Sequence, residues 1–194
     1  MNPLPTISLA LGTGFSSGLN LYATVATLGI LQRLGVIQLP EAMRALAHPW
    51  VIGIACALYA VEFFADKIPY VDTIWDALHT FIRPPAAAVL AYAASGAAAP
   101  EWRWGAALLA AGVALTSHGA KASARAAANV SPEPFSNWVL SLGEDVLAVW
   151  LSWMASAHPL ATIILVILLL ALCAFLLYHL FRFVRGALEK LLGS

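Results

Sequence analysis

The chain has 194 residues, of which 61% are hydrophobic and only 10% are charged. A soluble domain usually carries about 25% charged residues, so water is not the only solvent of this chain. Its 10 basic and 10 acidic side chains balance, which leaves no basic field for nucleic acid, and we expect no nucleic-acid partner.

Apolar segments long enough to cross a bilayer recur along the chain. A helix of about 20 residues spans a hydrocarbon core of about 30 Å, and shorter helices suffice where they pack inside a bundle. The segments that meet or approach this length are 7–34, 49–64, 84–99, 104–117, 135–157 and 160–183. We therefore predict an all-α integral membrane protein with a single transmembrane domain, 1–194, and about six transmembrane helices.

The first apolar segment is unusually polar and rich in glycine. A break near residues 14–18 would expose backbone N–H and C=O groups, which transporters use to hold ions and carboxylates. The ordinary alternative is a tight seam between helices, built from small residues. Asn20 is the candidate in this segment for neutral hydrogen bonds to a ligand.

Carboxylates lie in or beside two of the apolar segments. Glu62 and Asp66 are four residues apart at the end of the second segment, and Glu144 and Asp145 lie near the middle of the fifth. A carboxylate within a span costs about 2.5 to 3.5 kcal/mol unless it is paired or hydrated. The functional interpretation is that these acids carry protons or cations, and the structural interpretation is a permanent ion pair.

Residues 70–83 form an amphipathic pattern. Polar side chains fall at i, i+4, i+7 and i+11 of a helix and so share one stripe: Asp72, Asp76, His79 and Arg83. The stripe could line a permeation path in a re-entrant helix and hold a proton or a hard cation. It could instead face water on a helix that lies on the membrane surface. The pattern alone favours the surface helix slightly, because an exposed polar face costs little.

The segment that begins at residue 104 continues into a polar ladder on alanine-rich helix. Its side chains recur at three- and four-residue spacing and include His118, Lys121, Arg125 and Asn129. Lys121 and Arg125 could bind an anionic group of a solute. They could also pair permanently with the acids of the other segments, or reach toward anionic lipid at a cytoplasmic helix end.

The two halves of the chain, 7–99 and 102–185, show a weak internal similarity. A proline precedes each segment that bears carboxylates, and Glu62 then aligns with Glu144. Three spans in each half would require an inverted repeat, the usual construction of transporters, with a site near the bilayer midplane. Chance similarity between alanine-rich helices is the alternative.

The basic residues predict the orientation of the chain, because cytoplasmic loops are enriched in Lys and Arg. With the N-terminus in the cytoplasm, seven basic residues fall on or near that side and three fall outside, so we expect both termini to be cytoplasmic. The cytoplasmic set is Lys67, Arg83, Lys121, Arg125, Arg182, Arg185 and Lys190.

Three polar blocks carry a resemblance to a known family. They are 18–24, 62–84 and 118–138. In these blocks, and over about residues 8–155, the chain resembles the bacterial membrane proteins grouped as domain-of-unknown-function family four-one-two-six. The resemblance implies a compact bundle in the bacterial cytoplasmic (inner) membrane, covers the last helix least, and implies no activity or substrate.

Acids and bases on separate spans favour a transporter or channel-like protein that moves an ion or a small polar or anionic solute. In this hypothesis Glu62 and Glu144 carry protons or cations, and Lys121 and Arg125 meet an anionic group. We expect no cofactor. The expected partners are membrane lipid, the transported ion or solute, and a second copy of the chain, because so small a body often needs one to enclose a path.

The same residues are compatible with two other functions besides transport. The first is an intramembrane metal-dependent enzyme that acts on a lipid or another membrane substrate. Its metal would be held by Asp72, Asp76 and His79 with Glu62 or Asp66, since carboxylate and imidazole groups at helical spacing can bind a divalent ion. The second is a non-transporting membrane scaffold in which every charge is structural.

Overall fold

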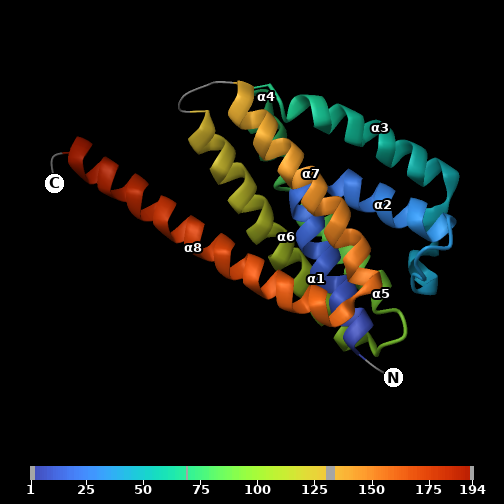
Figure 1. Cartoon of the computed structure of the whole chain (residues 1–194). Coiled ribbons are helices and arrows are strands. Elements are labelled where there is room, and N and C mark those ends of the chain that lie inside the picture. The colour runs from blue at the N-terminus through green and yellow to red at the C-terminus, as the bar shows by residue number, and fades with distance from the viewer. Residues whose placement is uncertain (1–2, 69, 130–133, 193–194) are drawn as a thin grey trace.

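The computed structural model describes residues 3–68, 70–129 and 134–192, and the regular structure of these residues is entirely helical (Figure 1). The elements are α1 (Leu4–Leu19), α2 (Leu21–Arg33), the 3-10 helix η1 (Glu41–Ala47), α3 (Pro49–Ala65), α4 (Val71–His79), α5 (Arg83–Ala94), α6 (Pro100–Ala128), α7 (Pro134–Ala157) and α8 (Pro159–Leu192). The all-α prediction is confirmed for this part of the chain.

Prolines mark where several of the helices begin. Pro49, Pro84 and Pro100 each occupy one of the first two positions of a helix, where the missing N–H group has no partner to lose. The predicted start of the third apolar segment is confirmed within one residue. Its helix, α5, ends at Ala94, five residues before the predicted end.

Helix α1 forms the centre of the bundle and contacts α5, α6, α7 and α8. Small residues make this close packing possible. A Cβ atom added at Gly18 would overlap the Ser117 hydroxyl, and one at Gly14 would lie 3.0 Å from the Ala110 carbonyl oxygen. The glycines of the first segment therefore form the tight helix seam that was the alternative to a break at residues 14–18.

The break in the first segment lies at Asn20, just beyond those glycines. Asn20 has an extended backbone (φ −149°, ψ 102°) and separates α1 from α2. Its side-chain oxygen accepts a hydrogen bond from Ala23 N–H at 2.9 Å and so caps α2. The expected single span is thus two helices of 16 and 13 residues, and α2 turns away from the axis of α1 (Figure 1).

Two of the described helices are long and apolar enough to cross a membrane. They are the Phe135–Ala157 part of α7 and the Pro159–Phe183 part of α8, and the bent pair η1 and α3 makes a third if it counts as one span. The other predicted segments are also helical but do not meet this standard alone. Helix α5 has only 12 residues, and α6 carries Lys121 and Arg125 along its length.

The distribution of polarity reverses that of a soluble protein. Arg83 and Arg125 have no exposed surface, whereas Phe81 is 80% exposed and Phe183 is 74% exposed. Helix α8 runs away from the rest of the bundle and presents apolar side chains over most of its length (Figure 1). Charged groups inside and large apolar groups outside are consistent with a membrane protein, whose surface meets lipid.

Candidate functional site

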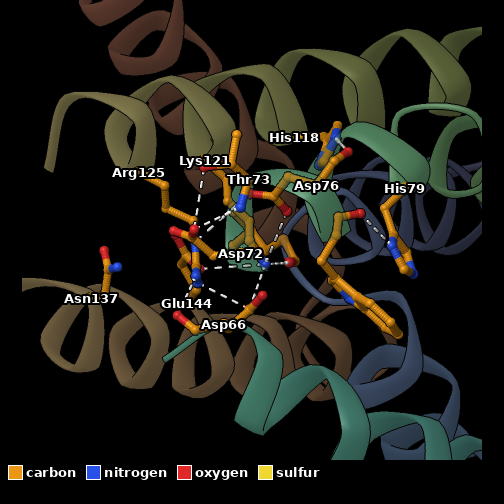
Figure 2. Close-up of polar contacts among 12 residues, drawn as sticks. Asp66, Asp72, Thr73, Asp76, His79, His118, Lys121, Arg125, Asn137 and Glu144 are labelled. Carbon is orange, nitrogen blue, oxygen red and sulfur yellow. Dashed lines mark hydrogen bonds and ion pairs between the residues drawn. The ribbon is translucent and has the colours of Figure 1, made fainter. Parts of the chain in front are cut away.

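Charged and amide side chains from α3, α4, α5, α6 and α7 meet inside the bundle (Figure 2). Asn20, at the break between α1 and α2, joins them through a hydrogen bond to Asp145. Each residue that the sequence marked as a candidate is in the described part of the chain. Twelve are buried, and the side chain of Glu144 is 13% exposed. The buried set is Asn20, Glu62, Asp66, Asp72, Asp76, His79, Arg83, His118, Lys121, Arg125, Asn129 and Asp145. The structure therefore brings together residues that lie far apart in the sequence.

Three ion pairs form the centre of this cluster. The Arg83 guanidinium donates to Glu62 at 2.8 Å, and the Lys121 ammonium donates to Asp66 at 2.9 Å. A third pair joins Arg125 Nη2 to Glu144 Oε2 at 2.5 Å. Each pair connects two different helices, or the end of one helix to another, so the cluster fixes how α3, α5, α6 and α7 pack together.

The same cations also contact the end of the broken helix. Arg83 donates to the carbonyl oxygen of Gly18, and Lys121 donates to that of Leu19, both at 2.9 Å. These carbonyls belong to the last turn of α1, where intrahelical partners are missing and the helix dipole is negative. The break at Asn20 thus provides backbone acceptors for the buried positive charges.

Asn20 and Asp145 extend the cluster to α7. The Asn20 amide group donates to Asp145 Oδ1 at 2.9 Å while its oxygen caps α2. Asp145 also lines a pocket of about 570 Å³ between α2, α3 and α7, whose other walls are mostly apolar and include Tyr59, Trp150 and Trp153. The pocket reaches from the outer surface of the bundle to the residue that holds the helix break.

The polar stripe of residues 70–83 faces the protein interior. Asp72, Asp76 and His79 are buried on α4, and Ile74 and Leu78 on the opposite face are exposed. The surface-helix interpretation, which the sequence pattern favoured slightly, is therefore wrong. Periodicity shows which residues share a face, but the direction of that face depends on the cations of α5 and α6, which attract the acids inward.

Asp76 is the acid of this stripe that points at the ion pairs. Its carboxylate oxygens lie 3.6 Å from Arg83, 3.8 Å from Lys121 and 3.9 Å from Arg125, and neither oxygen makes a hydrogen bond. Burial raises the pKa of Asp76 to about 6, although the three cations act in the opposite direction. Helix α4 has nine residues and is too short to span a bilayer.

Two histidines are held by fixed hydrogen bonds. Arg83 Nη1 donates to His118 Nδ1 at 2.7 Å, so the His118 ring is neutral and its Nε2–H group faces the Asp76 carbonyl oxygen at 3.0 Å. His79 Nδ1 lies 2.8 Å from the Trp75 carbonyl, which leaves Nε2 to meet the Tyr22 hydroxyl at 3.1 Å. Both rings orient neighbouring groups rather than joining the ion pairs.

The remaining predicted residues form an amide chain at the far end of α6. The Asn129 amide group donates to both Asp72 oxygens at 3.0 Å, and Asn137 donates to the Asn129 oxygen at 3.0 Å. Asn137 was not among the predicted site residues. The sequence indicates Lys67 only as a loop charge, whereas the buried Lys67 ammonium donates to the Ser141 hydroxyl at 3.0 Å. Its position directly after Asp66 was the available signal.

The candidate metal ligands do not converge. Asp72 faces Asn129, Asp76 faces the three cations, and His79 faces Tyr22. Among the residues described, no three His, Cys, Asp or Glu side chains are placed to hold a metal ion together.

The similarity to a known protein family extends over most of the chain. A family model described as a domain of unknown function (DUF4126) matches residues 7–179. The chain belongs to this family. The DUF4126 match covers every residue of the cluster and continues well into α8, beyond the expected limit at about residue 155. Comparisons with curated proteins and with solved structures gave no match.

Proposed function

We propose that this chain is a small membrane transporter or channel-like protein that moves an ion or a small polar solute through its charged interior. The observation that carries the proposal is the buried cluster of Arg83, Lys121 and Arg125 with their acids at the break between α1 and α2. Intramembrane ionisable groups commonly mark ion pathways, and broken helices commonly form transporter sites.

The ion pairs have alternatives within reach, which favours exchange over a fixed scaffold. Lys121 Nζ lies 2.9 Å from Asp66, 3.5 Å from Glu62 and Glu144, and 3.8 Å from Asp76. A small movement of the ammonium group would therefore change its partner. A purely structural role is also costly, because replacing a buried ion pair by apolar residues is often neutral or stabilising.

Acidic side chains and backbone carbonyl oxygens already bind the cations of the cluster, so the interior favours a positively charged solute over an anionic one. Lys121 and Arg125 each contact two or more carboxylates and a backbone carbonyl oxygen. An anionic solute would have to displace one of these groups. The solutes that this interior favours are therefore protons, small cations or neutral polar molecules, with membrane lipid around the apolar surface.

We further propose that the chain crosses the bacterial cytoplasmic membrane several times with both termini in the cytoplasm. The exposed apolar faces of α3, α7 and α8 support a lipid environment, and the short helix α4 would re-enter the bundle because its polar face points inward. Three features stay predictions: an inverted repeat of residues 7–99 and 102–185, six transmembrane spans, and assembly into a homo-oligomer.

The proposal is tested by ion flux into liposomes that contain the purified chain. Glu144→Gln removes one charge of the cluster, yet Arg125 keeps Asp66 as its partner, so the variant is expected to fold. Proton, Na⁺ and K⁺ flux are followed with trapped indicator dyes, and Glu189→Gln on the exposed end of α8 is the control. Loss of flux in Glu144→Gln alone supports the proposal, whereas equal flux in all three proteins removes Glu144 from the path.

A further inference from the structure

The charges of the cluster do not balance one to one. Arg83 pairs with Glu62, Lys121 with Asp66, and Arg125 with Glu144, each at 2.9 Å or less. These pairs use the three cations that lie 3.6 to 3.9 Å from Asp76, and the buried Lys67, Asp72 and Asp145 make their contacts elsewhere. Asp76 is the fourth acid, and it has no cation of its own.

The geometry around Asp76 differs from that of the paired acids. Its side chain is 3% exposed, and neither of its oxygens accepts a hydrogen bond. The groups that face it come from two helices and a helix end: Arg83 of α5, Lys121, Arg125 and His118 of α6, and Asp66 after α3. Because His118 is neutral, the charge near Asp76 comes from the paired acids and cations alone.

Within this group of three cations and four acids, an ionised Asp76 leaves one net negative charge, and a protonated Asp76 makes the group neutral. A net charge away from water is unfavourable, so the cluster should take up one positive charge. A metal cation would enter among three positive side chains, which repel it. A proton forms a covalent O–H bond with the carboxylate and needs no other ligands, so Asp76 can take it up although the same three side chains oppose it.

We propose that Asp76 is the proton-binding group of this interior. The Asp76 carboxylate takes a proton from water to form a carboxylic acid, and it returns the proton to water when it ionises. An ionised Asp76 competes for Lys121, and a protonated Asp76 leaves Lys121 to Asp66. This step rests on the proposed transport function. In a transporter, proton binding to Asp76 selects which acid pairs with Lys121 beside the Leu19 carbonyl.

The experiment compares Asp76→Asn with Asp72→Asn in the full chain. Both acids are buried on α4, but the Asp72 oxygens accept hydrogen bonds from Asn129, so Asp72 is a matched control. The protein is labelled with ¹³C at its aspartates, which are Asp66, Asp72, Asp76 and Asp145. Infrared difference spectra in nanodiscs then follow the C=O stretch of a protonated aspartic acid as the pH changes.

We expect one aspartic acid band to appear as the pH falls through the range near 6, to be absent in Asp76→Asn and to remain in Asp72→Asn. Persistence of the band in Asp76→Asn, or its loss in Asp72→Asn alone, overturns the proposal. The wild-type spectrum is decisive even if Asp76→Asn does not fold, because a wild type without any such band between pH 8 and pH 4.5 also overturns it.

Flux measurements separate this inference from the proposed function. Proton-driven flux that Asp76→Asn abolishes and Glu189→Gln on the exposed end of α8 retains supports both. Flux with the same pH dependence in wild type and Asp76→Asn overturns the role of Asp76 and leaves transport standing. A titrating Asp76 in a protein that moves no ion overturns transport and leaves the proton-binding group standing.

Discussion

The Asn20 side chain joins the two halves of a broken helix to α7, since its amide nitrogen donates to Asp145 at 2.9 Å and its oxygen caps α2 at 2.9 Å. One neutral residue therefore satisfies a buried carboxylate and an unpaired helix N-terminus together. This double role explains why the chain breaks here rather than at the nearby glycines.

Asn20→Ala is expected to destabilise the chain. Loss of an N-cap costs about 0.5 to 2 kcal/mol, and an unsatisfied buried acceptor on Asp145 costs about 1 to 3 kcal/mol more. The midpoint of thermal unfolding in detergent should fall clearly below that of wild type. Gln38→Ala, on an exposed residue, is the control, and an equal midpoint for Asn20→Ala would contradict the proposed double role.

Gly18→Ala tests the seam between α1 and α6. An added methyl group would overlap the Ser117 hydroxyl and approach the Ala114 carbonyl, so the two helices must separate. We expect a lower unfolding midpoint and loss of the Arg83 contact at the Gly18 carbonyl. Gly112→Ala on α6 has open space and should be neutral or stabilising. Similar midpoints for the two variants would show that the seam is loose.

Glu62→Gln should cost more stability than Glu144→Gln. Removing one partner of a fully buried ion pair costs about 3 to 5 kcal/mol, and Arg83 has no other carboxylate within 3.0 Å. Arg125 retains Asp66, and Glu144 is partly exposed. Unfolding midpoints of both variants measure the difference, and the double variant Glu62→Gln/Arg83→Gln should recover part of the loss. Equal losses for the two single variants would contradict this ranking.

The stability of the chain should depend on pH through Asp76. Its pKa rises from an ordinary value of 3.8 to about 6 in the folded chain, so the folded state binds this proton more tightly than the unfolded state. The stabilisation of the folded state by proton binding to Asp76 is fully present below pH 4 and is lost as the pH rises through 6. The midpoint of Asp76→Asn minus that of wild type should therefore increase from pH 4 to pH 7. A flat difference for Asp76→Asn would contradict the shifted pKa.

The sequence predicts which residues form the cluster better than it predicts how they are arranged. Glu62, Lys121 and Glu144 stand out because a charge inside an apolar segment needs a partner. The sequence left a break near residues 14–18 and a tight helix seam open as alternatives, because glycine can serve either as a helix break or as a packing surface, and it did not indicate the break at Asn20. Only the positions of Ala110 and Ser117 decide between these two uses.

The sequence alone could not predict which way the polar face of α4 points or where the apolar segments are divided into helices. The stripe that contains Asp76 has the same periodicity whether it faces water or the bundle, so its environment depends on long-range pairing with α6. Hydropathy likewise predicts six segments, but it does not show that the first is divided at Asn20 or that α5 has only 12 residues. The sequence also marked Asp145 and Asn129 as candidates. Their spacing alone could not show that Asp145 accepts a hydrogen bond from Asn20, or that Asn129 donates one to Asp72.

The most direct test of a conducting charged interior is the rate at which an imposed pH difference decays across liposomes that contain the purified wild-type chain. The account predicts that this rate exceeds that of protein-free liposomes by at least about tenfold, the effect of about 1.4 kcal/mol on a barrier. Decay at the protein-free rate, with Na⁺ and K⁺ flux also at background, would contradict it.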